Sequence, residues 1–225
     1  MSTARDARPP KRILRFDCGR YFVRTIKRED ASDRWAGWLA DPWAAGVMNS
    51  PARTLGKRDI ADYIRQFDQR SRLLLGIFEK GTRAHVGIIR IDADYVTNEC
   101  HVNVLIGDPE YRGRGLMSEI SVATFDYIFE ETATRKLTAS TLARNELIKS
   151  YLIGAGWQLD GTHRLAKKSA AGGAMLDVCS FSLTCEAWRA WKETRAARRI
   201  LRRLGKADTI SSAARAFSGK SLPRT

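Results

Sequence analysis

The sequence predicts a mixed α/β fold, in which one mostly antiparallel sheet of seven strands carries helices on both of its faces. The apolar spacing gives the element order β-α-α-β-β-β-α-β-α-β-β, which is typical of a sheet covered by helices. The fourth strand, the long helix and the fifth strand form a β-α-β unit, so this pair is expected to be parallel with a right-handed crossover. Hydrophobic residues make up 44% of the chain, enough to bury a substantial core.

The first half of the chain contains four of the predicted strands and two helices. Trp35, Trp38 and Leu39 recur at helical spacing, and Asp41 and Pro42 end that helix. A short glycine turn joins the second and third strands as a hairpin. The predicted elements are a strand at 20–27, helices at 30–40 and from Thr54 onward, and strands at 73–79, 85–93 and 99–106.

A long helix that begins near Gly115 opens the second half of the chain. A shorter helix ends at Gly156, since glycine commonly terminates helices. The elements that follow the long helix are a strand at 136–142, a helix at 145–155, antiparallel strands at 158–167 and 175–183, and a helix at 186–204. The chain therefore divides into a basic N-terminal tail (1–15), a folded domain (16–185), a basic amphipathic helix (186–205) and a flexible tail (206–225) rich in Ser, Ala and Arg.

Most of the formal net charge of +14 belongs to the two ends of the chain. Residues 1–15 carry +4 and residues 186–225 carry +8, which leaves +2 for residues 16–185. Such ends are either solvated surface or contacts for nucleic acid or acidic membranes.

No apolar run is long enough to span a bilayer, and no signal-peptide pattern follows the basic start. We therefore expect a cytoplasmic protein, with a membrane-peripheral position as the alternative. The four cysteines form no C-x-x-C pair, so neither a metal site nor a disulfide framework is expected.

The most informative stretch is Asp-Pro-Glu-Tyr-Arg-Gly-Arg-Gly-Leu-Met at residues 108–117, between a strand and the long helix. Gly113 and Gly115 allow a tight turn that brings backbone N–H groups towards a ligand. The helix N-terminus adds unpaired donors and a positive dipole end, and Arg112 and Arg114 add charge. This combination predicts a pyrophosphate site. It is neither a Rossmann fingerprint, since a third glycine is missing, nor a P-loop, since no Gly-Lys-Ser/Thr follows.

This turn resembles the acetyl-CoA-binding turn of the GNAT acetyltransferase superfamily, whose pattern is Arg or Gln, two residues, Gly, one residue, then Gly or Ala. Arg112 and Gly115 match the pattern, and Met117 departs from its final small residue. Asn145, with a Gly-Trp pair eleven and twelve residues later, is similar to a second motif of the family. The element order fits the same fold. The run at 104–111 looks most like the branch of ribosomal-protein N-terminal, polyamine and amino-sugar acetyltransferases.

The resemblance implies an N-acetyltransferase that moves an acetyl group from acetyl-CoA, its co-substrate, to a primary amine by direct attack in a ternary complex, without a metal. The acceptor is expected to be an amino sugar or another small amine. Two alternatives stay open: a protein N-terminal acetyltransferase of the ribosomal-protein type, and a catalytically inactive module that binds acyl-CoA or an anionic surface. The implied cofactor contacts are Val104, Leu105 and Ile106 on the fourth strand, Arg112, Gly113, Arg114, Gly115, Leu116 and Met117 in the turn, and Asn145 beside the pantetheine arm.

Three residues are candidates for proton transfer. His101 stands where the related branch commonly has a glutamate, and an unperturbed pKa near 6.5 suits a general base. The alternative is a histidine that is merely hydrogen-bonded at the sheet surface. Glu99 is the rival base. Tyr151 stands one position before the tyrosine that many relatives use as the acid, and one residue is about 100° on a helix. If Tyr151 only packs in the core, water protonates the leaving thiolate.

The acceptor pocket is expected between the fourth strand and the loop after the first helix. On the strand, His101 and Asn103 alternate with valines and present a polar face. In relatives that loop commonly covers the acceptor. The predicted substrate contacts are therefore Trp43, Met48 and Asn103.

The basic C-terminal helix is amphipathic. One broad face carries apolar and small residues, and the other carries lysines and arginines. The helix either docks on its own domain or on a second subunit, which would make a homodimer, or it contacts an anionic membrane or RNA. Trp188 falls among the basic residues, and aromatic interleaving is sparse, so a membrane is favoured over RNA.

Overall fold

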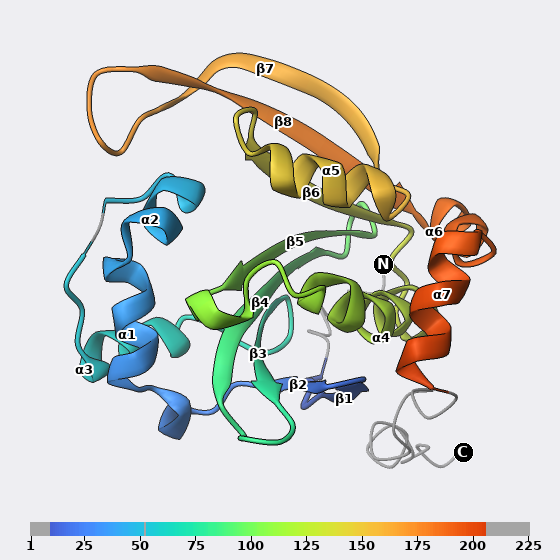
Figure 1. Cartoon of the computed structure of the whole chain (residues 1–225), viewed down its shortest axis with the longest axis horizontal. Helices are drawn as coiled ribbons and strands as arrows, with labels where there is room; N and C mark the ends of the chain where they lie inside the picture. The colour runs from blue at the N-terminus through green and yellow to red at the C-terminus, as the bar shows by residue number, and fades with distance from the viewer. Residues whose placement is uncertain (1–9, 52, 206–225) are drawn as a thin grey trace, which may run out of the picture.

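The strand-forming runs assemble into one sheet in the order β1-β2-β3-β4-β5-β6-β8-β7 (Figure 1). The computed structural model describes residues 10–51 and 53–205. All neighbouring strands are antiparallel except β5 and β6, so the predicted mixed, mostly antiparallel sheet is confirmed. The strands are β1 (Arg15–Cys18), β2 (Tyr21–Thr25), β3 (Arg72–Glu79), β4 (His85–Asp94), β5 (Glu99–Ile106), β6 (Lys136–Leu142), β7 (Gln158–Lys168) and β8 (Met175–Thr184).

The prediction of seven strands is wrong by one, because β1 was not expected. Phe16 and Cys18 are buried while Arg15 and Asp17 are exposed, so β1 does alternate. Four residues at the end of a basic segment are too few for that period to stand out in the sequence. The strand begins at the last residue of the segment predicted as an N-terminal tail.

The helices are close to their predicted positions, with two corrections. They are α1 (Asp33–Ala40), α2 (Pro42–Met48), α3 (Lys57–Ile64), α4 (Leu116–Glu131), α5 (Glu146–Gly154), α6 (Cys185–Lys192) and α7 (Arg195–Leu204), with short 3-10 helices η1 (Arg28–Asp30) and η2 (Pro109–Tyr111). The predicted loop after the first helix is the helix α2. Pro42 ends α1 but occupies the first position of α2, where its missing N–H costs nothing, and the Asp41 side chain accepts from Trp43 N at 3.1 Å.

The second correction concerns the C-terminal helix, which is two helices. The chain breaks after α6, and the Thr194 side chain caps α7 by accepting a hydrogen bond from Ala197 N at 3.1 Å. Both helices dock on their own domain. Trp188 is 1% exposed and Trp191 is 8% exposed, and their indole N–H groups donate to Asp126 Oδ1 and Gly154 O, each at 2.7 Å. Trp188 therefore belongs to the core and not to the basic face.

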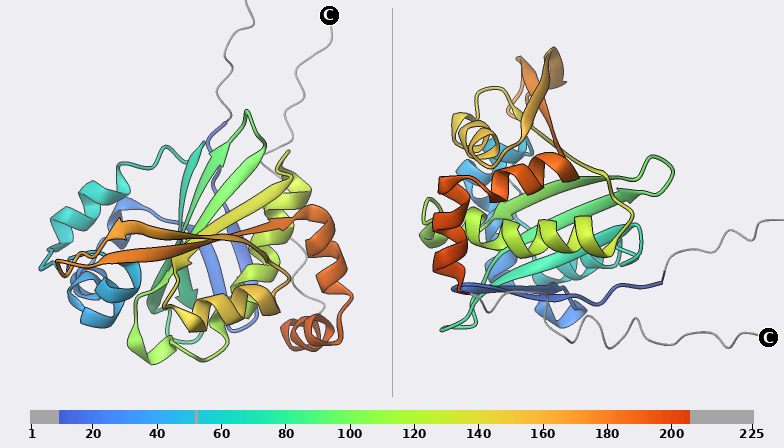
Figure 2. Two further views of the ribbon diagram at one scale, coloured as in Figure 1. Left: turned by 90° about the horizontal axis from the view of Figure 1, so that it is seen from above. Right: turned by 90° about the vertical axis from the view of Figure 1, so that its right-hand side faces the viewer.

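Two hydrophobic clusters hold the layers together on opposite faces of the sheet. The main cluster joins the sheet to α4, α5, α6 and α7, and it includes Leu116, Trp157 and Trp188. The second joins the other face to α1 and α3 through Trp35 and Ile60. Figure 2 shows α4 lying across one face of the sheet, with the helices of the N-terminal half behind the sheet.

The helix α1 is seated directly against the segment that follows β5. A Cβ atom added to Gly107 would lie 1.9 Å from Trp38 Cδ2, so only glycine lets the tryptophan ring approach this backbone. The next residue, the buried Asp108, pairs with the guanidinium of Arg34. Close packing and an ion pair thus fix the start of the glycine-rich segment.

The described helices include none that is long and apolar enough to cross a membrane. The predicted flexible tail at 206–225 and the first nine residues of the N-terminal tail lie outside the described residues. The division of the chain into domains stays a prediction.

Candidate functional site

The strands β5 and β6 form a fork. Their parallel ladder runs over three pairs and ends where His101 faces Thr138. The neighbour on the other side, β4, pairs with β5 over its whole length. In the described part of the chain, residues 102–106 therefore have a strand partner on one edge only. Backbone groups on the other edge are open to a ligand, and the predicted contacts of Val104, Leu105 and Ile106 stay a prediction.

The glycine-rich turn at the tip of this fork has the geometry of an anion site. Gly113 and Gly115 have φ values of +70° and +77°, in the left-handed region that favours glycine. A Cβ at either position would meet nothing within 4 Å, so the space in front of the turn is open. The first intrahelical bonds of α4 run from Ser118 and Glu119 to Gly115 O. The preceding N–H groups and the helix dipole are left for an anion, and they fit a pyrophosphate.

The guanidinium of Arg112 is engaged by other groups of the protein. Its guanidinium donates to Ile106 O at 3.2 Å and Gly107 O at 2.6 Å, and it lies 2.6 Å from Asp41 Oδ2. It also stacks over the Trp43 ring, 4.1 Å from its centroid. Arg112 thus ties α2 to the end of β5, a role that its spacing in the sequence did not reveal. Its predicted contact with the cofactor remains a prediction.

The other turn residues offer mainly backbone. Arg114 is exposed, whereas Leu116 is 1% exposed and belongs to the core. Met117 packs against the main hydrophobic cluster, so its side chain is held by the core beside the turn. Backbone N–H donors and one exposed arginine are therefore what the turn presents to a pyrophosphate.

Asn145 lies at the N-terminus of α5, on the far side of the fork. Its Oδ1 accepts from Ile148 N at 3.4 Å, which makes it the cap of that helix. The amide nitrogen of the same side chain stays free to donate to a pantetheine arm, as the resemblance implied.

Tyr151 ties α5 to α4. Its hydroxyl lies 2.6 Å from Ser121 Oγ and donates to Met117 O at 3.3 Å. Burial raises the pKa of Tyr151 to about 12. A thiol has a pKa of about 8.5, so proton transfer from this phenol to a thiolate is unfavourable. Tyr151 is thus buried and hydrogen-bonded between α4 and α5, and its role as the acid stays a prediction.

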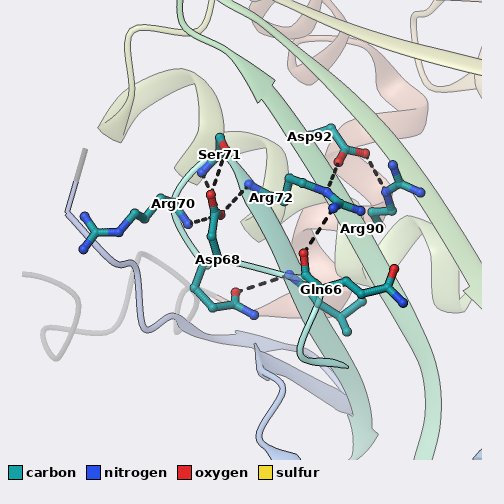
Figure 3. A network of polar contacts seen from close by, with 9 residues as sticks. Gln66, Asp68, Arg70, Ser71, Arg72, Arg90 and Asp92 are labelled. Atoms are coloured by element: carbon teal, nitrogen blue, oxygen red, sulfur yellow. Dashed lines mark hydrogen bonds and ion pairs between the residues drawn. The ribbon is translucent and has the colours of Figure 1, made fainter. Parts of the chain in front are cut away.

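His101 lies where β5 and β6 separate. Its Nδ1 is 3.0 Å from Thr138 Oγ1, and the ring is half-buried. Burial lowers the pKa of His101, against a smaller opposing effect of Asp92, its direct neighbour on β4. In Figure 3 the carboxylate of Asp92 is shared by two ion pairs, with Arg90 at 2.6 Å and Arg72 at 3.5 Å. The lowered pKa favours the neutral form of His101, which can accept a proton.

The rival base Glu99 is engaged elsewhere. Its carboxylate pairs with Lys136 Nζ at 2.6 Å, at the closed end of the fork. It lies two residues before His101, which is about 7 Å farther along the strand from the glycine-rich turn. His101 thus lies nearer than Glu99 to the open end of the fork, and the choice of base stays a prediction.

The predicted acceptor residues come from α2 and β5. Trp43 is 46% exposed, Met48 is 36% exposed, and Asn103 is exposed on β5. The end of α2 is joined to the β7–β8 hairpin, because Asn49 donates to Lys168 O and accepts from Ala170 N, both at 2.9 Å. In Figure 1 the hairpin arches over to α2. The fork is thereby framed by α2 and the hairpin.

A surface depression elsewhere does not belong to this site, and the described residues include no group that could hold a metal ion. An open depression of about 820 Å³ lies between η1 and α3, lined mainly by charged residues such as Arg28 and Arg58, and none of the predicted residues lines it. The described residues include no group of three or more His, Cys, Asp or Glu side chains that could hold a metal ion.

Comparison with known proteins agrees with the geometry. The family model for the acetyltransferase (GNAT) domain matches residues 20–157. Ribosomal-protein-S5-alanine acetyltransferase from Vibrio fischeri is 21% identical, with a TM-score of 0.66 over 78% of this chain and 98% of that chain. Spermidine N-acetyltransferase from Vibrio cholerae, solved with CoA and spermine, is 12% identical, with a TM-score of 0.67 over 76% of this chain and 98% of that chain.

A GCN5-related N-acetyltransferase from Brucella melitensis is 13% identical, with a TM-score of 0.70 over 91% of this chain and 90% of that chain. At these identities the solved structures show a shared fold. No curated protein matches the sequence. The resemblance drawn from the glycine-rich turn is confirmed by the family match.

Proposed function

The chain belongs to the GNAT acetyltransferase family, and from this premise we propose that it transfers an acetyl group from acetyl-CoA to the primary amine of a small molecule, an amino sugar being the leading acceptor. It is an acyl-CoA-dependent acetyltransferase, and the family uses acetyl-CoA as its co-substrate. The observation that carries the proposal is the open turn at Gly113 and Gly115, placed at the tip of the forked strands.

The reaction requires a neutral amine. Its nitrogen attacks the carbonyl carbon of the thioester, the carbon–sulfur bond breaks, and an amide and the free thiol are formed. A lysine-like amine with a pKa of about 10.4 is neutral in only about one molecule in a few thousand at pH 7, whereas an α-amine is neutral in about one in ten. A lysine-like amine therefore needs a general base at the fork, where His101 lies, whereas an α-amine can use water.

The frame around the fork supports a small acceptor. The hairpin that meets α2 through Asn49 spans the region that the acceptor must enter. A small amine passes such a frame more readily than a folded protein. Transfer to a protein N-terminus is the second candidate, because the Vibrio fischeri relative is a ribosomal-protein-S5-alanine acetyltransferase. An inactive binding module is the third.

An acceptor screen tests the proposal. Release of free thiol from acetyl-CoA is followed with an amino sugar, a peptide that begins with alanine, and spermidine. We expect the largest kcat/KM with the amino sugar. A larger value for the peptide would move the function to N-terminal acetylation. Protein that binds acetyl-CoA but releases thiol with none of the three would contradict the enzymatic proposal.

The outer face of the C-terminal helices is proposed to contact RNA. Because Trp188 and Trp191 are buried, the aromatic residues that would anchor the helices in a membrane are occupied. What remains exposed on α7 is a row of arginines, which attracts the phosphates of a nucleic acid. These residues are Arg195, Arg198, Arg199, Arg202 and Arg203.

The RNA contact predicts a charge-dependent loss. Replacing Arg199, Arg202 and Arg203 by glutamine should leave the fold intact, since all three are exposed and no acidic group is placed at the end of α7, and should abolish filter binding of a generic single-stranded RNA at low salt. Binding of the unchanged protein should weaken as salt rises. If the unchanged protein co-sediments with anionic vesicles and binds them more strongly than it binds RNA, the membrane alternative would be restored. The homodimer stays a prediction, which sedimentation analysis can check.

A further inference from the structure

We propose that Arg20 is a positioning residue for acyl-CoA: it neutralises Glu119 beside the anion site and fixes the peptide between Arg114 and Gly115. This inference rests on the proposed function. Arg20 belongs to the turn between β1 and β2, remote in sequence from the glycine-rich turn, and no motif of the sequence pointed to it.

The contacts of Arg20 converge on the start of α4. Its Nε and Nη2 donate to Glu119 Oε1 at 2.9 and 2.6 Å, and its backbone N–H donates to Glu119 Oε2 at 3.0 Å. The same Nη2 donates to Arg114 O at 2.8 Å. One guanidinium thus binds both the first helical turn of α4 and the backbone of the glycine-rich turn.

The first consequence is electrostatic. Glu119 lies in the first turn of α4, where a carboxylate favours the helix but repels any anion bound at the same end. Its side chain is only 17% exposed, so solvent screens it incompletely. The guanidinium of Arg20, with two nitrogens donating to Glu119 Oε1, compensates this charge. Without Arg20, the pyrophosphate would meet an uncompensated carboxylate.

The second consequence is geometric. A trans peptide holds its C=O and N–H pointing in opposite directions. A bond from Arg20 to Arg114 O therefore directs the N–H of Gly115 away from Arg20. This peptide joins Arg114 to Gly115, which has a positive φ, and a glycine on one side gives the peptide more freedom to rotate. Arg20 removes this freedom before the ligand arrives.

The position of Arg20 is itself secured by the C-terminal helices. A Cβ atom added to the preceding Gly19 would lie 2.7 Å from both Glu119 Oε2 and Leu204 Cδ2. The end of α7 therefore closes over the turn between β1 and β2. Leu204, outside the matched family domain, thus packs beside the residue that precedes Arg20.

The test compares acetyl-CoA affinity, by calorimetry, in the full-length protein and in Arg20→Ala. Arg20→Ala removes the charge-assisted hydrogen bonds to Glu119 and Arg114. It should weaken acetyl-CoA binding on the order of tenfold and raise the KM for acetyl-CoA, with kcat unchanged. Arg65→Ala is the matched control. Arg65 is 56% exposed and Arg20 58%, and each pairs with a carboxylate, but Arg65 pairs with Asp62 on α3. The control should bind as the unchanged protein does.

Two further variants separate the two effects. Glu119→Gln should bind acetyl-CoA at least as well as the unchanged protein. Adding Glu119→Gln to Arg20→Ala should recover only part of the lost affinity, and the Arg20→Ala deficit should shrink at high salt. Full recovery would refute the role in fixing the peptide. An Arg20→Ala affinity within twofold of the unchanged protein would overturn the proposal, whereas absence of acyl-CoA binding by the unchanged protein would instead overturn the proposed function.

Discussion

Gly115→Val is expected to abolish acetyl-CoA binding. Gly115 has a φ of +77°, and a residue with a side chain in the left-handed region costs about 1–2 kcal/mol. The valine methyl groups would also occupy the open space in front of the turn, where nothing now lies within 4 Å of the Cβ position. The backbone N–H groups of the turn, which we propose bind the pyrophosphate, would be displaced and covered at once.

Thermal unfolding with and without acetyl-CoA measures this effect. A ligand that binds only the native state raises the melting temperature, so the unchanged protein should show a rise and Gly115→Val none. Gly173→Val is the matched control, because Gly173 also has positive φ, at +75°, and open space around its Cβ position, but lies in the β7–β8 turn. A rise of the same size in Gly115→Val and in the unchanged protein would exclude the turn as the binding site.

His101→Ala is expected to lower kcat by roughly 10²–10⁴ while acetyl-CoA affinity stays the same, as for loss of a general base. A base works when it is unprotonated, so activity should fall as pH falls through the pKa of His101. Burial lowers that pKa, and the acidic limb of the kcat profile should therefore lie below the ordinary histidine value of about 6.5. In His101→Ala this limb should disappear.

His163→Ala is the control for this experiment. His163 is exposed on β7, where its Nε2 lies 3.0 Å from Ser180 Oγ across the hairpin, and its loss should leave the pH profile unchanged. A loss below threefold in His101→Ala, with the acidic limb retained, would transfer the role to Glu99 or to water. Glu99→Gln would then separate these two.

Local patterns were sufficient wherever one segment decides its own structure. The bounds of β5 and β6 agree residue for residue with the predicted strands, because alternating or apolar runs of seven or eight residues carry a clear period. The positive φ of Gly113 and Gly115 is also a local property, since glycine adopts this conformation without the strain that a side chain would add. The β-α-β order likewise implied the parallel pair that becomes the fork.

Local sequence patterns gave a wrong prediction where a break between two short helices changes the phase of the helical period. The helical wheel drawn through one continuous C-terminal helix placed Trp188 among the arginines. The chain breaks before Thr194, so α6 buries Trp188 and Trp191 while α7 buries Ala197 and Leu204, each in its own phase. The break is set by the cap at Thr194 and by the tertiary surface that each helix must cover.

The sequence by itself determined every strand except β1, the long helix, the glycine-rich turn and, through its resemblance, the family. Only the tertiary structure decided which partners the charged groups meet. Arg20 binds Glu119 across 99 positions of the chain, and Trp188 binds Asp126 across 62. Such pairs form because the folded sheet and helices bring the two groups within hydrogen-bonding distance. No spacing rule connects residues so far apart, since the intervening chain leaves their separation undetermined until it folds.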